Sequence, residues 1–102
     1  MIEQKRGQYR IIRTDETEST VVLKPAIEVI RKIINAPQSL ASVTLSRNDH
    51  GAEVVMMVDD TGMIDGKPVN DKATALAREA FGETYPHKIH GDVIIVNDED
   101  FA

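Results

Sequence analysis

The strongest pattern of apolar and polar positions runs from Glu53 to Gly82. Apolar residues follow one another without a break over residues 54–58. This pattern predicts a strand that is covered on both faces and lies inside its sheet. Residues 59–70 then combine acids, glycines and a proline, which favour turns and restrict the backbone. We therefore expect a turn region with one defined path after the strand.

Residues 71–81 predict an amphipathic helix, because their apolar side chains recur three and four positions apart and share one face. The residues of this face are Ala73, Leu76, Ala77, Ala80 and Phe81. Asn70 directly precedes the helix, and its side-chain oxygen can accept a hydrogen bond from the first turn. Gly82 follows it, and we expect this glycine to close the helix in the left-handed conformation.

The first third of the chain predicts a hairpin and a second helix. Strands at residues 9–13 and 20–24 flank a charged turn, which is the pattern of a hairpin. Pro25 suits the first position of a helix, and Pro37 marks its end. The helix between them carries a broad apolar stripe through Ile27, Ile30 and Ile34.

Two further strands complete the predicted elements. Residues 40–45 form a less regular strand, and the turn residues that follow it predict a hairpin with the strand at 54–58. Residues 93–96 are apolar on both faces and predict another interior strand. Together the elements predict an α+β domain: a small, mostly antiparallel sheet of five or six strands, with two helices packed on one face. Residues 1–7 and 98–102 are expected to be loose tails of this single domain.

Composition narrows the possible classes of function. The chain has 102 residues, the size of one domain, and no cysteine, which excludes disulfides and thiolate chemistry. We expect no signal peptide and no membrane span, since no long apolar run occurs. The lack of cysteine fits a reducing cytoplasm. A net charge of −5 and few aromatic residues argue against a nucleic-acid partner.

The segment 60–70 is the best candidate for a binding site, because loops held by a rigid scaffold often carry function. Its polar members are Asp60, Asp65, Lys67 and Asn70. The glycines, the proline and Asn70 also suit turn geometry and helix capping, and we expect that structural role to dominate. If a ligand or partner binds, we expect these four residues and His87 to contact it.

No metal or cofactor site is expected. The acids at residues 59–65 lack the ligand spacing and the distal glutamate of a calcium loop. His87 and His90 form an H-x2-H pair close to Asp92, but zinc needs three or four ligands and no second cluster is evident. His50 lies in a different turn. We therefore expect surface histidines rather than metal ligands.

One segment carries a family resemblance. In the segment of residues 62–70, fixed residue types alternate with variable ones, and a strand that is preceded by Gly91 follows downstream. The alternating residues are Gly62, Ile64, Gly66, Pro68 and Asn70. This order, over roughly residues 9–97, resembles the family catalogued as domain of unknown function 3846, small proteins found largely on bacteriophage and mobile-element genomes. The chain departs from that pattern at Lys67, where an apolar residue is usual. The resemblance implies a phage or mobile-element origin, a bacterial host cytoplasm and no particular catalytic activity.

These observations favour a non-catalytic binding or interaction module that acts on a host protein or a small ligand. Two alternatives remain open. One is a small hydrolase or transferase that uses Asp60, Asp65, Lys67 or a histidine, which would require a concave pocket holding at least two of them. The other is a nucleic-acid-associated regulator. We expect no cofactor and no membrane partner, and a homodimer formed through a sheet edge is compatible with the pattern.

Overall fold

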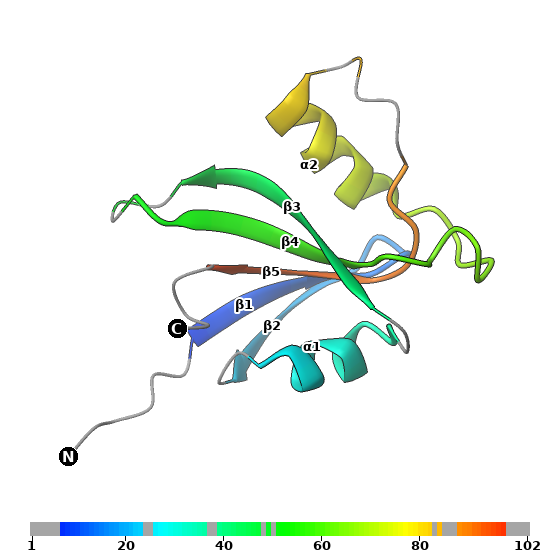
Figure 1. The fold of residues 1–102 in the computed structure, drawn as a ribbon, viewed down its shortest axis with the longest axis horizontal. Coiled ribbons are helices and arrows are strands. Elements are labelled where there is room, and N and C mark those ends of the chain that lie inside the picture. The colour runs from blue at the N-terminus through cyan, green and yellow to red at the C-terminus, as the bar shows by residue number, and fades with distance from the viewer. Residues whose placement is uncertain are drawn as a thin grey trace.

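A computed structural model of the chain describes residues 7–23, 26–36, 39–47, 49, 51–82, 84 and 88–97, and the statements below concern these residues. The chain forms five strands and two helices, with two strands before each helix and one strand at the end, as Figure 1 shows. The elements are β1 (Gly7–Ile12), β2 (Glu18–Leu23), α1 (Ile27–Ile33), β3 (Leu40–Arg47), β4 (Glu53–Asp59), α2 (Asp71–Phe81) and β5 (Val93–Asn97). The predicted loose tails fall mostly outside the described residues, although Gly7 already belongs to β1.

The strands form one antiparallel sheet in the order β2-β1-β5-β4-β3. Both predicted hairpins are present, because β1 pairs with β2 and β3 pairs with β4. The strands that were predicted to be interior, β4 and β5, each have a neighbour on both sides. The irregularity expected in β3 is a register shift between Thr44 and Ser46. The α+β class and the mostly antiparallel sheet of five strands are therefore confirmed.

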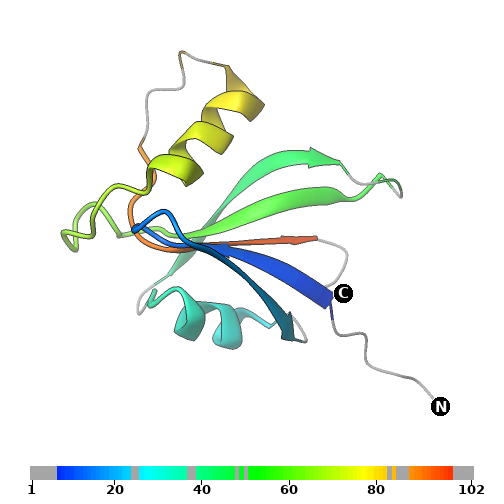
Figure 2. The same ribbon diagram turned by 180° about the vertical axis from the view of Figure 1, so that it is seen from behind.

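The two helices lie on opposite faces of the sheet, so the prediction that both pack on one face is wrong (Figures 1 and 2). Alternate residues of β4 enter different cores: Val55 and Met57 pack with α1, whereas Met56 and Val58 pack with α2. A strand that is apolar on both faces needs a cover on both faces. The pattern that identified β4 as interior therefore already called for a helix on each side.

Helix α1 is shorter than predicted, and a local motif ends it. The prolines at its predicted ends lie outside the described residues. Asn35 adopts a positive φ of 54°. Its N–H donates to the carbonyl of Lys32 at 3.3 Å, and the N–H of Ala36 donates to that of Arg31 at 2.8 Å. These two bonds form a Schellman motif, in which an asparagine can replace the usual glycine. Asn35 therefore ends α1.

Helix α2 spans the predicted residues, and Asn70 caps it by accepting a hydrogen bond from the N–H of Ala73 at 3.1 Å. Gly82 ends the helix with φ 101° and ψ 159°. Its φ is positive, but its ψ lies outside the left-handed helical region, so the prediction of a left-handed cap is wrong in ψ. Only the first half of the apolar face is well covered. Ala73 and Ala77 are buried, whereas Phe81 is 54% exposed. Among the described residues, no helix has the length and apolar character needed to cross a membrane.

Candidate functional site

The loop between β4 and α2, residues 60–70, is closed at its base by an ion pair. Lys67 Nζ lies 2.6 Å from Asp59 Oδ2, and the Asp59 side chain has no exposed area. The contact joins an ammonium group to a carboxylate that has no exposed area, so it is a buried ion pair. Because Asp59 ends β4 and Lys67 directly follows the turn at residues 60–66, this pair joins the two ends of that turn.

Lys67 also joins the loop to the end of α1. Its Nζ donates to the backbone carbonyls of Ile34, at 3.4 Å, and of Asn35. These carbonyls belong to the turn that ends α1 and carry the partial negative charge of a helix C-terminus, where a cation is favourable. The Lys67 side chain is only 17% exposed. Its charge is therefore used inside the protein rather than offered to solvent.

Asp59 is held as a carboxylate. Burial raises the pKa of Asp59, but the Lys67 ammonium group and two hydrogen bonds from Thr61 outweigh it, so the pKa lies below its ordinary value of 3.8. The Thr61 N–H donates to Asp59 Oδ1 at 3.0 Å, and the Thr61 hydroxyl lies 3.1 Å from the same oxygen. The buried charge is thus paired at one oxygen and hydrogen-bonded at the other.

Backbone hydrogen bonds give the rest of the loop a fixed shape. The N–H groups of Asp65, Gly66 and Lys67 donate to carbonyls of residues 61–63 at 2.9–3.2 Å. The Thr61 hydroxyl also lies 2.9 Å from Asp65 Oδ2. Gly66 supplies a positive φ of 77°, which a side chain would disfavour. The turn region was predicted to follow one defined path, and these bonds are consistent with that.

Two large apolar side chains lie at the tip of this ordered loop. Met63 is 71% exposed and Ile64 is 81% exposed. Asp60 and Asp65 lie on either side of them, and both are exposed. Single exposed apolar residues are common on protein surfaces, but two adjacent ones on a loop fixed by internal bonds make a defined contact point. We call Met63 and Ile64 the loop tip.

The residues predicted to bind a ligand do not come together at one site. Asp60 accepts a hydrogen bond from the Ser39 hydroxyl at 3.3 Å, and Asp65 contacts Thr61. These two acids face solvent, whereas Lys67 points toward the end of α1. His87 lies outside the described residues.

Asn70 is buried, with 1% of its surface exposed. Its amide nitrogen donates to the carbonyls of Ile12, at 2.9 Å, and of Gly91, at 3.0 Å. Its oxygen caps α2 through Ala73. Asn70 thus connects β1, the approach to β5 and the start of α2, and its side-chain groups all have partners inside the protein.

His90 and Asp92, which were considered as metal ligands and not expected to be such, are engaged within the fold. His90 Nδ1 lies 2.8 Å from the carbonyl of Lys67. Asp92 forms an ion pair with Arg13 at 2.9 Å and accepts a hydrogen bond from the Thr14 N–H. Within the described ranges, no group of three or more histidines or acids has a geometry suited to a metal ion.

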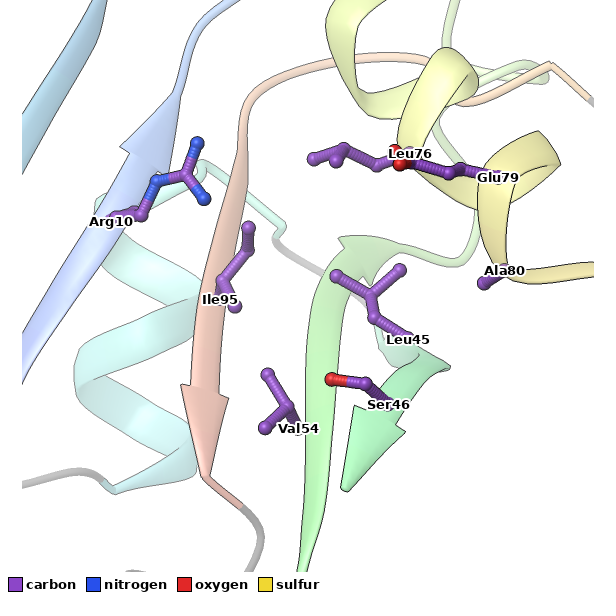
Figure 3. Close-up of a pocket in the computed structure, with 8 residues that line it drawn as sticks. All are labelled: Arg10, Leu45, Ser46, Val54, Leu76, Glu79, Ala80 and Ile95. Carbon is purple, nitrogen blue, oxygen red and sulfur yellow. The ribbon is translucent and has the colours of Figure 1, made fainter. Parts of the chain in front are cut away.

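Sequence reasoning did not find the hollow beneath the second half of α2, shown in Figure 3. It has a volume of about 340 Å³ and lies where α2 leaves the sheet. Its lining residues are Arg10, Leu45, Ser46, Val54, Leu76, Glu79, Ala80 and Ile95. Residues from four strands and a helix meet there, so spacing along the chain could not reveal it. A second hollow, of about 240 Å³, lies against α1.

Neither hollow is lined by a residue that was predicted to bind a ligand. Comparison of the chain with protein-family models, with curated proteins and with solved structures gives no match. The resemblance to domain of unknown function 3846 therefore stays a prediction.

Proposed function

We propose that the chain is a non-catalytic interaction module that binds a partner protein through the loop tip. The observation that carries this proposal is the exposure of Met63 and Ile64, at 71% and 81%, on a loop held by the Asp59–Lys67 ion pair. Because the loop is already ordered, a partner does not bear the cost of ordering it. The family resemblance is the reason for choosing a bacterial host protein as the partner class.

The loop tip is the part that would be buried in the partner. Complete burial of an aliphatic side chain of this size contributes about 1.5–3 kcal/mol. Two such side chains supply about 3–6 kcal/mol, which corresponds to a 10²- to 10⁴-fold change in affinity. This is the contribution expected of a small hot spot within a larger contact.

The exposed acids beside the tip suggest the chemistry of the partner. Asp60 and Asp65 would lie at the rim of the contact, where charge mainly sets specificity and the rate of association. A partner that offers an apolar pocket bordered by lysine or arginine is complementary to this surface. The same acids oppose a nucleic-acid backbone or an anionic membrane.

The enzymatic alternative has less support from the geometry. It requires at least two of the candidate residues in one concave pocket, and neither hollow contains any of them. Lys67 is engaged with Asp59 and with the end of α1. A small apolar ligand in the hollow of Figure 3 is a second candidate, because Leu45, Leu76 and Ile95 give the hollow an apolar lining.

The proposal can be tested by site-specific photo-crosslinking in bacterial cells. A photoreactive residue at position 64 should give a discrete adduct with one host protein. The same residue at position 49, in the exposed turn at the other end of β4, is the matched control and should give none. Charge reversal with D60K/D65K should weaken the adduct at position 64, and M63S in the same chain should weaken it further. Equal adducts at both positions, or none at position 64, would contradict the proposal.

A further inference from the structure

The two edges of the sheet are protected to different degrees. β3 carries a bulge between Thr44 and Ser46, and α2 packs beside it. β2 pairs with β1 in unbroken register over all its residues, Glu18–Leu23, and contains neither a bulge nor a proline. Within the described part of the chain, no strand pairs with its other side. A regular and uncovered edge of this kind is a template for another strand.

Exposed apolar side chains gather beside this edge. Val22, on β2, is 55% exposed, and at the start of α1 Ile27 is 48% and Val29 is 39% exposed. Figures 1 and 2 both show α1 beginning beside the end of β2. Val22 lies on the α2 face, because its neighbour Val21 packs with the α1 core. Ile27 and Val29 lie on the α1 face, so apolar side chains are exposed on both sides of this edge. We call Val22, Ile27 and Val29 the β2-edge set, for their position. It accounts for three of the six large hydrophobic residues that are exposed in the described ranges.

Ile27 shows that the core on the α1 face is incomplete at this point. Ile27, Ile30 and Ile34 lie three and four positions apart and share one stripe of the helix. Ile30 and Ile34 are 0% and 1% exposed, whereas Ile27 is half exposed. The apolar stripe therefore continues beyond the part of the sheet that covers it. A further layer beside β2 would extend that cover.

Charge does not oppose the pairing of two β2 strands. Glu18 is the only ionisable residue of β2, and Arg10 neutralises it at 2.6 Å.

Opposite residues of an antiparallel pair project to the same face, so Val22 of each copy would lie on the α2 face near the join. A two-fold axis perpendicular to the sheet would also place both α1 helices on one face.

We infer that a second copy of this chain pairs with β2, antiparallel, to form a continuous ten-stranded sheet across a two-fold axis. Such a contact is isologous, so one surface serves both copies and the assembly closes as a dimer. Stable interfaces bury roughly 1,200 Å² or more, which a single short strand pair does not reach. The start of α1 must therefore contribute, and Ile27 and Val29 are the residues positioned to do so. The inference is independent of the loop tip.

Cysteine crosslinking tests the pairing directly, because the natural chain has no cysteine. Single variants S19C, T20C and V21C are oxidised, and covalent dimer is measured on a non-reducing gel. The yield should peak at one of these positions, nearest the two-fold axis, and identify the register. D49C, in the turn between β3 and β4, is the control and should remain monomeric. Equal yield at position 49, or none in β2, would overturn the inference.

The mass in solution gives a second and independent measurement. Light scattering should find about twice the chain mass of 11.3 kDa for the wild type. V22K/I27K should return it to the monomer with an unchanged circular dichroism spectrum, whereas M63S/I64S should remain dimeric. A wild-type monomer at millimolar concentration, or a V22K/I27K variant that is still dimeric, would refute the pairing. Loss of the dimer in M63S/I64S alone would assign the contact to the loop tip instead.

Discussion

Replacing Lys67 with methionine is the most direct test of how the loop is held. The change removes the ammonium group 2.6 Å from Asp59 Oδ2 and leaves a carboxylate with no exposed area and no counter-ion. Breaking a buried ion pair by removing one partner costs about 3–5 kcal/mol. Thr61 still donates to Oδ1, and Lys67 is itself 17% exposed, so we expect the lower end of that range, about 3 kcal/mol.

A second loss occurs at the end of α1. Without the ammonium group, the carbonyls of Ile34 and Asn35 lose their charged donor, which adds about 0.3–1 kcal/mol. For a domain of this size, 1 kcal/mol shifts Tm by about 4–8 °C. Lys67→Met should therefore melt at least ~10 °C below the wild type. The free energy of unfolding from urea titrations gives the same comparison at constant temperature.

The pH dependence separates the ion pair from simple loss of packing. In the wild type the pKa of Asp59 lies below 3.8, so the stability that this group contributes is present above pH 3.8 and is lost as the pH falls through the lower, folded value. In Lys67→Met, burial is no longer opposed by the ammonium group, so the pKa of Asp59 rises relative to the wild type. The stability difference between the two proteins should be full at neutral pH and should shrink in acid.

Two further variants complete this test. Lys88→Met changes an exposed lysine and should leave the stability at neutral pH within about 0.5 kcal/mol of the wild type. The double variant D59N/K67M removes both charges and should be more stable than K67M alone, because no unpaired charge is then buried. A stability difference for K67M that stays constant from neutral to acid pH would show that the electrostatic account is mistaken.

Three other changes test separate parts of the region. Asn70→Ala removes the cap of α2 and two buried donor bonds, and should cost about 2–4 kcal/mol in urea unfolding; a loss within error would show that its network is replaceable. Gly62→Ala should lower the stability more than Gly66→Ala. A Cβ added to Gly62 would lie 2.8 Å from the backbone carbonyl of His90, whereas a Cβ added to Gly66 would lie in open space. The reverse order of melting temperatures would contradict this geometry. M63S/I64S should change the free energy of unfolding by less than about 0.5 kcal/mol, since both side chains are exposed; a larger loss would mean that the tip packs inside the protein.

The elements with strong periodicity could be predicted from the sequence. The bounds of α2 and the cap at Asn70 follow from local pattern and from side-chain chemistry, which act over a few residues. The end of α1 was harder to predict. Asparagine can adopt the left-handed conformation, but the residue type alone does not show that Asn35 does so. The placement of the helices on opposite faces could have been predicted from β4, because a strand that is apolar on both faces needs a cover on each of them.

The candidate site was less predictable, because it depends on contacts between distant segments. The composition of the loop identified Lys67 as a residue of interest, but its partners are a residue at the end of β4 and carbonyls of α1. Ile64 was noted as part of a sequence pattern, and nothing in that pattern shows that its side chain faces solvent. Exposure of an apolar residue is a property of the folded surface, so local spacing cannot supply it.

The segment between β4 and α2 has two parts with different roles. Residues 67–70 orient α2, since Asn70 connects the helix to β1 and to the approach to β5. Residues 60–66 are not needed for that connection, yet they are held by backbone hydrogen bonds and closed by a buried ion pair. Fixing each residue costs about 1–2 kcal/mol of backbone entropy, which a simple linker would not need to offset. The interactions at the base of the loop offset this cost, and their result is a fixed position for Met63 and Ile64. This is the physical reason to look for a partner at the loop tip.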